Sequence, residues 1–404
     1  MPTRRGLALF LAAALATACA GRTAPAPREH WLGTWAASPQ LVEPRNLPPA
    51  PGLAGNTLRQ FVHVSVGGGR IRLRLSNVFG DGPLAVTAVR VARPAGGGAV
   101  DTTTARAFTF GGADSVVIPA GQAVTSDPLD YPVAPFADLA LTLHFGAVPA
   151  AVTGHPGSRS VSYLATGDRA GAPVLAGAAT AEHWYVIAGL DVVAEGAALV
   201  TLGNSITDGR GSGTDRNDRW PDDLARRLAA DSATRRVAVL NAGIGGNKVL
   251  AGGLGPPALS RLERDVLDAT GARWVIVLEG VNDIGGAAPG TGADVARDLI
   301  AAYQRIAAAA HARGLRIYGG TITPFGGSFY DSPEHEEARQ TVNRWIRTSG
   351  GGAFDAVIDF DAAVRDPADP RRLLPAADTG DHLHPNEAGY RLMADAIDLT
   401  LFTR

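Results

Sequence analysis

The hydrophobic period of the chain changes near residue 196, and this change restricts the possible folds more than any other feature. Beyond it, short apolar runs alternate with longer stretches of helical period, which is typical of a parallel sheet with helices on both faces. The predicted strands are 198–202, 237–241, 274–279, 316–321 and 356–359, and the predicted helices are 220–230, 258–268, 293–313, 333–348 and 386–401. We therefore expect a doubly wound α/β domain over residues 196–404.

Before residue 196 the dominant period is two, which indicates strands. Predicted strands bounded by Gly and Pro are 61–66, 70–75, 84–91, 107–110, 115–118, 139–145 and 161–164. The first two flank Gly67-Gly68-Gly69, a pattern that predicts a β-hairpin. Many short strands without a helical period favour an all-β sandwich or jelly-roll domain over residues 28–195. Such a domain could bind carbohydrate or only shape a neighbouring site, and its residues do not decide between the two.

The amino terminus has the parts of an export signal. Arg4 and Arg5 precede the apolar run 7–15, and small residues close that run. The run is too short to span a bilayer, so we expect residues 1–27 to be a signal peptide and linker. Cys19, the only cysteine, follows Ala18 as in a bacterial lipoprotein cleavage site. The expectation is an exported protein, either secreted or periplasmic, or a cell-envelope lipoprotein whose only membrane tether is Cys19.

The charge balance argues against several classes of partner. The chain has 39 acidic and 37 basic residues and a net charge of −2, which gives no electrostatic reason to bind nucleic acid. A nucleotide-binding α/β domain is improbable because the chain lacks a phosphate-loop lysine and the glycine spacing of a dinucleotide fingerprint. The oligomeric state is not indicated by any feature of the sequence.

Polar stretches follow several predicted strands of the α/β domain. They are residues 203–209, 241–247 and 279–283, with a fourth at 381–386 that leads into the final helix. Open α/β sheets bind their ligands at the carboxyl ends of the strands, so we expect these four stretches to meet.

The four stretches contain the parts of an acyl-transfer site. Ser205 is the candidate nucleophile, and a serine needs an adjacent base to take its proton. His384 is the candidate base, and Asp381, three residues earlier, is the candidate carboxylate that orients the imidazole. Backbone N–H groups of a glycine loop and an asparagine amide could supply the oxyanion donors.

Each of these candidate residues could also have a purely structural role. Ser205 could lie in an ordinary strand-to-helix turn, and Gly245-Gly246 could be another such turn. Asn282 and Asp283 could cap a helix, which both residue types favour. His382 and His384 could bind a metal ion, but no further ligand accompanies them at the required spacing. No G-x-S-x-G elbow is present, so an ordinary α/β-hydrolase is not expected.

The four stretches, in this order, resemble the four blocks of the SGNH/GDSL hydrolase superfamily, which carry a Ser, a Gly, an Asn and a His. The resemblance covers about the last 205 of the 404 residues. It implies Ser205 as the nucleophile and Asp381 and His384 as its triad partners. It also implies an oxyanion hole formed by Ser205, Gly246 and Asn282, and a three-layer, flavodoxin-like α/β/α domain. Neither a metal nor a cofactor is implied.

One position departs from the family pattern, because Gly-Asp-Ser reads Gly203-Asn204-Ser205 here. The amino-terminal motif at residues 33–39 and the variant at 279–285 resemble a branch in which a β domain precedes the hydrolase domain, similar to bacterial acetyl xylan esterase-like proteins. The resemblance implies a serine esterase that deacetylates carbohydrate through an acyl-enzyme. The alternatives are a lipase or lysophospholipase acting on lipid or short-chain acyl esters, and a non-catalytic carbohydrate-binding protein that retains the fold.

Overall fold

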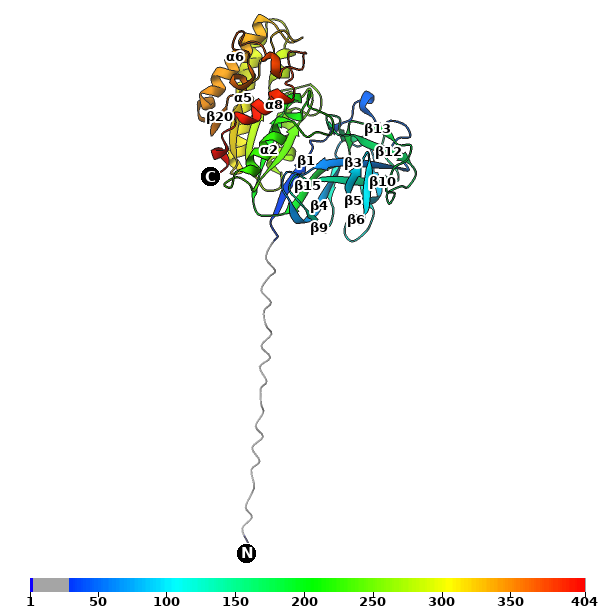
Figure 1. Cartoon of the computed structure of the whole chain (residues 1–404). Coiled ribbons are helices and arrows are strands. Elements are labelled where there is room, and N and C mark those ends of the chain that lie inside the picture. Colours follow the sequence, from blue (N-terminus) through cyan, green and yellow to red (C-terminus); the bar gives the residue numbers. More distant parts are fainter. Residues whose placement is uncertain (3–28, 404) are drawn as a thin grey trace.

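The computed structural model describes residues 1, 2 and 29–403, and the remainder of the predicted signal peptide, with Cys19, lies outside these residues. Figure 1 shows an all-β region beside a region of alternating strands and helices. Among the described residues, no helix combines the length and the apolar character needed to cross a membrane.

The all-β region contains three antiparallel sheets. The first has β1 (Trp31–Ala36), β15 (Ile187–Val193), β4 (Gly68–Asn77) and β8 (Gln122–Thr125), with β9 (Leu129–Val133) paired to β4. The second runs β13 (Ala179–Ala181), β12 (Ser162–Thr166), β3 (Asn56–His63), β10 (Asp138–Phe145), β5 (Leu84–Gly96), β6 (Ala99–Ala107), with β7 (Val116–Ile118) paired to β5. The third and smallest contains β14 (Trp184–Tyr185), β11 (Thr153–His155) and β2 (Gln40–Leu41), and the short helix η1 (Pro44–Asn46) follows β2.

The predicted hairpin around Gly67 is wrong. Strand β3 pairs with β10 and β12 of the second sheet, whereas β4 pairs with β15, β8 and β9 of the first. The connection between them carries Val64 and Val66, both buried, so the chain crosses between the sheets instead of turning at the surface. The predicted strand at 107–110 is also wrong, because β6 ends at Ala107 and Phe110 forms only an isolated bridge.

The second region is built on a parallel sheet in the order β17-β16-β18-β19-β20. Its strands are β16 (Ala197–Gly203), β17 (Val237–Gly243), β18 (Ala272–Leu278), β19 (Arg316–Gly320) and β20 (Ala356–Ile358). This is the flavodoxin-like order 2-1-3-4-5 of a doubly wound sheet. The predicted fold class, an α/β/α domain preceded by an all-β region, is therefore confirmed.

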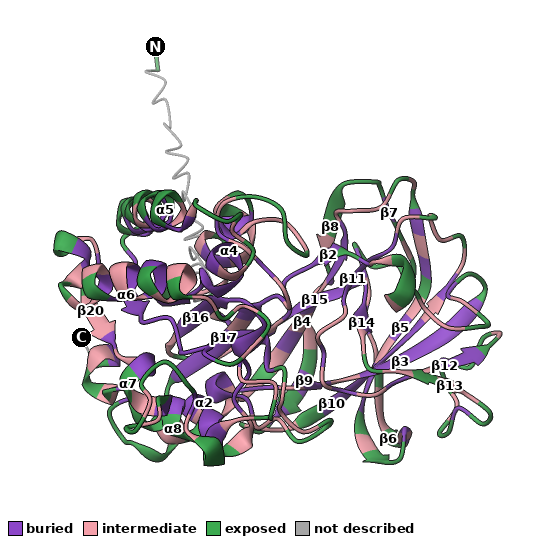
Figure 2. Ribbon diagram, turned by 90° about the horizontal axis from the view of Figure 1, so that it is seen from above, coloured by how far each residue is buried: buried purple, intermediate pink, exposed green. Residues whose placement is uncertain are grey.

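Helices cover both faces of this sheet. Figure 2 shows α4 (Val281–Gly285), α5 (Gly292–Ala312) and α6 (Pro333–Arg347) on one side, and α2 (Trp220–Ala230), α7 (Phe360–Val364) and α8 (Glu387–Asp395) on the other. The predicted helix at 258–268 consists of α3 (Ala258–Leu262) and a π-helical turn, η2 (Glu263–Leu267). The predicted final helix is shorter, since η5 (Leu399–Phe402) follows α8 after a break. The short helices η3 (Ser349–Gly352) and η4 (Pro375–Ala377) lie in connections.

The two regions share one apolar core. Leu32 of β1 and Leu240 of β17 are both buried in the same continuous cluster of side chains. Strand β17 forms an edge of the parallel sheet, and the Oγ of Ser65 accepts a hydrogen bond from the N–H of Val239 at 3.1 Å. A second contact joins the N–H of Gly33 to the carbonyl of Thr270 at 2.9 Å. The β region thus covers an edge that would otherwise be open to pairing.

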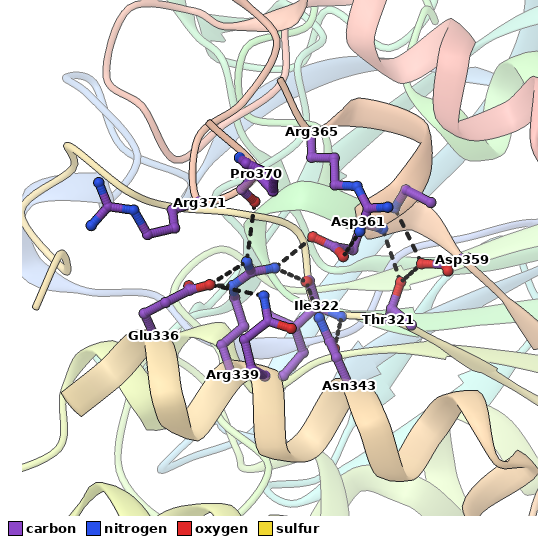
Figure 3. A network of polar contacts seen from close by, with 12 residues as sticks. Thr321, Ile322, Glu336, Arg339, Asn343, Asp359, Asp361, Arg365, Pro370 and Arg371 are labelled. Carbon is purple, nitrogen blue, oxygen red and sulfur yellow. Dashed lines mark hydrogen bonds and ion pairs between the residues drawn. The ribbon is translucent and has the colours of Figure 1, made fainter. Parts of the chain in front are cut away.

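A buried ionic network fixes the segment that leads to residues 378–385 (Figure 3). Asp361, at the start of α7, is fully buried and accepts hydrogen bonds from Arg339 at 2.6 Å, Arg347 at 2.5 Å and Arg365 at 3.1 Å. Arg339 also donates to the carbonyl of Ile322 at 3.1 Å. Because its members are mutually paired, the network holds α6, α7 and the chain after β19 together.

Candidate active site

Ser205 lies where the first parallel strand meets a short helix. Strand β16 ends at Gly203, and α1 (Ser205–Asp208) begins two residues later. Asn204 caps this helix, because its Oδ1 accepts a hydrogen bond from the N–H of Ile206 at 3.0 Å. As the first helical residue, Ser205 has an N–H group without an intrahelical partner. The side chain is nearly buried, with 6% of the residue exposed.

The structure brings Ser205, His384 and Asp381 into one line of hydrogen bonds. The Oγ of Ser205 lies 2.9 Å from Nε2 of His384, and Nδ1 of His384 lies 2.7 Å from Oδ2 of Asp381. The other carboxylate oxygen of Asp381 accepts from the N–H groups of His384 at 2.9 Å and Leu383 at 3.0 Å, and from Oγ1 of Thr379 at 3.0 Å. The loop therefore fixes the carboxylate, and the carboxylate fixes the imidazole.

The environment sets the charge of both groups. Burial lowers the pKa of His384 below its ordinary value, against the opposing effect of the Asp381 carboxylate. Burial raises the pKa of Asp381, but hydrogen bonds from the backbone and ring of His384 outweigh it and hold this pKa well below its usual range. Near neutral pH the imidazole is therefore neutral and able to accept a proton, while Asp381 is ionised.

Three residues that carry candidate N–H donors, Ser205, Gly246 and Asn282, line the same cavity. Among residues 29–403, the backbone N–H groups of Ser205 and Gly246 have no protein acceptor. Gly246 has a φ of 69°, a left-handed conformation that favours glycine. Nδ2 of Asn282 donates to the carbonyl of Asn247 at 2.7 Å, which leaves its second hydrogen free. The hydroxyl of Tyr330 donates to Oδ1 of Asn282 at 3.1 Å and so fixes the orientation of the amide.

Ser205, Gly246, Asn282 and His384 line a cavity of about 460 Å³. This arrangement can place an ester carbonyl against the serine hydroxyl while its oxygen faces the three donors. The geometry is that of a site for acyl transfer.

The helix-cap interpretation of Asn282 and Asp283 is wrong. Gly280, with a φ of 100°, caps α4, and both residues lie inside that helix. The carboxylate of Asp283 accepts from the N–H groups of Val249 at 2.9 Å and Leu250 at 3.0 Å. Asp283 thereby holds the loop after Gly246 in place.

The second histidine of the fourth block lies apart from Ser205. Nδ1 of His382 is 2.6 Å from Oδ2 of Asp378, so this half-exposed imidazole pairs with a nearly buried carboxylate and not with Ser205. Within the described part of the chain, no group of three or more His, Cys, Asp and Glu side chains is placed to hold a metal ion.

Asn204, the residue that departs from the family pattern, contacts a buried carboxyl group. Its Nδ2 donates to Oε2 of Glu279 at 3.1 Å, and Arg261 lies 3.8 Å from Oε1. Burial raises the pKa of Glu279 to about 8. An aspartate at position 204 would place a second carboxyl group beside Glu279, so the neutral amide suits this environment.

Much of the cavity wall comes from the β region, which sequence reasoning did not assign to the site. The wall residues from this region are Gln40, Glu43, Arg45, Asn46, Pro156, Gly157, Arg159 and His183. They belong to separate loops with no fixed spacing from the hydrolase motifs, so no sequence signal identified them. Tyr330 was missed for the same reason, whereas Asp208 lies inside the first polar stretch and was missed because its partner, His155, comes from the β region.

Comparison with known proteins shows one family whose model matches part of the chain. Residues 201–392 match the model of the GDSL-like lipase/acylhydrolase family. A search of curated proteins found no match.

Similar solved structures cover about half of this chain. They include Axe2, an acetylxylan esterase from Geobacillus stearothermophilus, with 21% identity over 50% of this chain and 93% of that one and a TM-score of 0.38. The acetyl xylan esterase AlAXEase is 24% identical over 49% of this chain and 96% of its own, with a TM-score of 0.39. A GDSL-like lipase from Bacteroides thetaiotaomicron VPI-5482 is 17% identical over 49% of this chain and 84% of its own, with a TM-score of 0.36.

Proposed function

We propose that this chain, a carboxylic ester hydrolase of the SGNH/GDSL superfamily by its match over residues 201–392, acts through an acyl-enzyme on Ser205. One observation carries the proposal: Oγ of Ser205 is 2.9 Å from Nε2 of His384, whose Nδ1 is 2.7 Å from Asp381. A serine that only ended a strand would not need a buried histidine oriented by a carboxylate.

The proposed reaction has two steps. His384 takes the proton of Ser205 as the hydroxyl oxygen attacks the ester carbonyl, and Asp381 stabilises the imidazolium that forms. The N–H groups of Ser205 and Gly246 and the amide of Asn282 hold the oxyanion. Collapse of the tetrahedral intermediate passes the proton to the leaving alcohol. Water, deprotonated by His384, then attacks the acyl-enzyme and releases the acid.

The proposed substrate is an acetylated carbohydrate. Most of the residues that line the cavity carry charges or hydrogen-bonding groups, among them Glu43, Asn46 and His183, although the exposed surface of the wall is more apolar than polar. Such groups can hydrogen-bond the hydroxyls of a carbohydrate alcohol.

A second candidate is an ester with a longer acyl chain or a lipid. Two exposed apolar side chains, Phe329 and Leu254, lie on the wall of the same cavity, with 76% and 37% of each residue exposed. They could contact an acyl chain that extends out of the site.

We also propose that the protein is exported. The support is the sequence of residues 1–27, in which arginines precede a short apolar run that ends in small residues. Fractionation of bacterial cells that express the full-length chain tests this: the mature chain should appear outside the cytoplasm, with Cys19→Ser releasing it from the membrane if Cys19 is lipidated. Retention of the full-length chain in the cytoplasm would contradict export.

The decisive experiment measures acetate release from a panel of acetylated polysaccharides beside p-nitrophenyl esters from acetate to dodecanoate. Wild type should release acetate from a polysaccharide and should lose activity as the acyl chain lengthens. Ser205→Ala should remove hydrolysis of every substrate. Faster hydrolysis of the long esters would favour the lipid alternative, and an inactive wild type would favour the non-catalytic one.

A further inference from the structure

Three arginines on the wall of the active-site cavity have no acidic partner. Arg45 and Arg159 belong to the β region, and Arg210 follows α1. Within residues 29–403, these guanidinium groups form neither an ion pair nor a side-chain hydrogen bond, and the Nε of Arg159 is buried without a partner.

The carboxylates of the same wall, in contrast, are paired within the protein. Asp381 is bonded to His384. Glu43 accepts from Gln40 at 2.7 Å and from Asn46 at 2.9 Å. Oδ1 of Asp208 is bonded to a histidine of the β region, although its Oδ2 has no hydrogen-bond partner. The formal charges of the wall therefore balance, three arginines against Glu43, Asp208 and Asp381, and within residues 29–403 the arginines differ in that their guanidinium groups have no side-chain partner.

Arg159 lies on a loop, residues 156–160. The first residues of this loop are fixed to the α/β region, residues 197–403. His155 precedes this loop, and its Nε2 lies 2.8 Å from Oδ1 of Asp208, with both side chains buried. Its Nδ1 lies 2.9 Å from the carbonyl of Ser38. Gly157 packs directly against Asp208, since a Cβ at this position would come within 1.8 Å of Oδ2. The chain can approach so closely only because residue 157 is glycine.

The rest of the loop is also hydrogen-bonded to the α/β region. Arg219 donates to the carbonyl of Ser158 at 2.9 Å, and the N–H of Asp215 donates to the carbonyl of Arg159 at 2.8 Å. Arg159 has a φ of 50°, a left-handed conformation that is costly for a residue with a side chain. A strained backbone conformation persists only where surrounding contacts hold it, and such residues are common at ligand-binding sites.

Two of the arginine charges are close enough to affect the proposed base. Besides burial, which has the largest effect, the charges of Arg210 and Arg159 both lower the pKa of His384. A group bound by Arg159 or Arg210 would therefore occupy the same cavity as an ester positioned on Ser205.

We infer that Arg45, Arg159 and Arg210 form a subsite for an anionic group on the substrate, the carboxylate of an acidic sugar that carries the ester. This inference rests on the proposed function. A planar guanidinium matches a carboxylate through two parallel hydrogen bonds. The β region then contributes to substrate selection inside the active site.

A pair of substrates that differ only in charge tests the inference. One is an O-acetylated methyl galactopyranosiduronate, and the other is the corresponding uronamide. The measured quantity is the ratio of their kcat/KM values for acetate release. Wild type should prefer the uronate about tenfold or more, the effect of one charge-assisted hydrogen bond. Added salt should reduce this ratio, because Arg45 and Arg210 are exposed and Arg159 is half-buried.

Variants of the arginines distinguish a role in the subsite from general effects on folding or on catalysis. Arg159→Gln should bring the ratio toward one, and Arg210→Gln should do the same if the first variant does not fold. Arg305→Gln, on the exposed side of α5, is the matched control and should keep the wild-type ratio. A wild-type ratio near one, or a ratio unchanged in both subsite variants, would overturn the inference.

Two further outcomes are informative. A stronger preference for a sulfated analogue than for the uronate would contradict the assignment of a carboxylate. If Ser205→Ala still hydrolysed both substrates at the wild-type rate, the proposed function itself would fail, and this result differs from a Ser205-dependent activity without charge preference.

Discussion

At the scale of single residues, the proposed chemistry depends on neighbours that hold Ser205 and His384 in place. Asn204 caps the helix that starts with Ser205, and Asp381 orients the ring of His384. Asn282 is held between the carbonyl of Asn247 and the hydroxyl of Tyr330. Each contact gives a prediction about rate or stability.

The first prediction concerns pH. A protonated His384 cannot accept the proton of Ser205, so kcat/KM should fall as the pH drops through the pKa of this histidine. Because burial lowers that pKa, the midpoint should lie below about 6.5. Asp381→Asn removes the carboxylate that opposes the burial effect, so the midpoint should move lower still, with a loss of about 10⁴-fold in kcat. His382→Ala, the control, should leave the midpoint unchanged, and a midpoint above about 7 in wild type would contradict the assignment.

The second prediction concerns the oxyanion hole. Asn282→Ala should lower kcat by about 10²–10³-fold with little change in KM, because the amide acts on charge that develops in the transition state. Tyr330→Phe keeps the amide and removes only the bond that orients it, so its loss should be about fivefold, near 1 kcal/mol. Steady-state kinetics on p-nitrophenyl acetate measures both. Equal losses in the two variants would rule out a direct role for Asn282.

The third prediction concerns the residue that departs from the family pattern. In Asn204→Asp the new carboxyl is buried beside Glu279, so its pKa should be higher in the folded than in the unfolded state. A carboxyl group shifted in this direction destabilises the fold once the pH exceeds its unfolded pKa. The free energy of unfolding should fall by about 1–3 kcal/mol near pH 9, and by less near pH 5, where Glu279 is protonated.

Asn204→Ser is the matched control for this variant, because serine caps a helix without adding charge. Urea denaturation at the two pH values measures the difference. An Asn204→Asp protein as stable as Asn204→Ser near pH 9 would show that the amide is not needed beside Glu279.

At the scale of elements, local signals predicted the α/β region well and the β region poorly. Helix α2 starts as expected with Pro221 in its first turn, and Gly314, with a φ of 71°, ends α5. Such signals act within a few residues, so the sequence reports them directly. The strands around Gly67 were found, but their pairing was not, since the choice between two sheets depends on residues far along the chain.

The candidate site likewise contains residues that the sequence predicted and residues that it did not. Ser205, Gly246, Asn282 and His384 follow strands or precede a helix, where an open α/β sheet gathers its functional residues. Arg159 reaches the same cavity from the all-β region, and His155 contacts Asp208 of the cavity wall, and no rule of strand order or spacing links either residue to the site. Only the packing of the two regions brings them there.

The fourth prediction concerns the loop at residues 156–160. His155→Ala should reduce the free energy of unfolding by about 3–5 kcal/mol, because it leaves the buried carboxylate of Asp208 without its partner. His311→Ala is the control, since His311 forms a similar 2.9 Å contact with Asp355 at an exposed position. Its effect should be about 0–1 kcal/mol. Denaturant unfolding of both variants checks the contrast, and equal effects would mean that the loop is not held by this pair.

At the scale of the whole molecule, the β region is part of the active site and part of the core. It covers the free edge of strand β17, and its apolar side chains continue the cluster that packs under the parallel sheet. Its loops complete a cavity whose opposite wall carries Ser205 and His384. Under the proposed function, residues of the α/β region carry the reaction, and the fit between the two regions shapes the cavity that receives the substrate.

The central claim is that Ser205 carries the acyl group, and covalent labelling tests it most directly. A fluorophosphonate reacts with a serine that an adjacent base has activated, and peptide mapping by mass spectrometry then identifies the modified residue. We predict one adduct per chain, on Ser205, formed at least 10²-fold more slowly in His384→Ala and absent in Ser205→Ala. An adduct on another residue, or full esterase activity in a chain labelled at Ser205, would contradict the account.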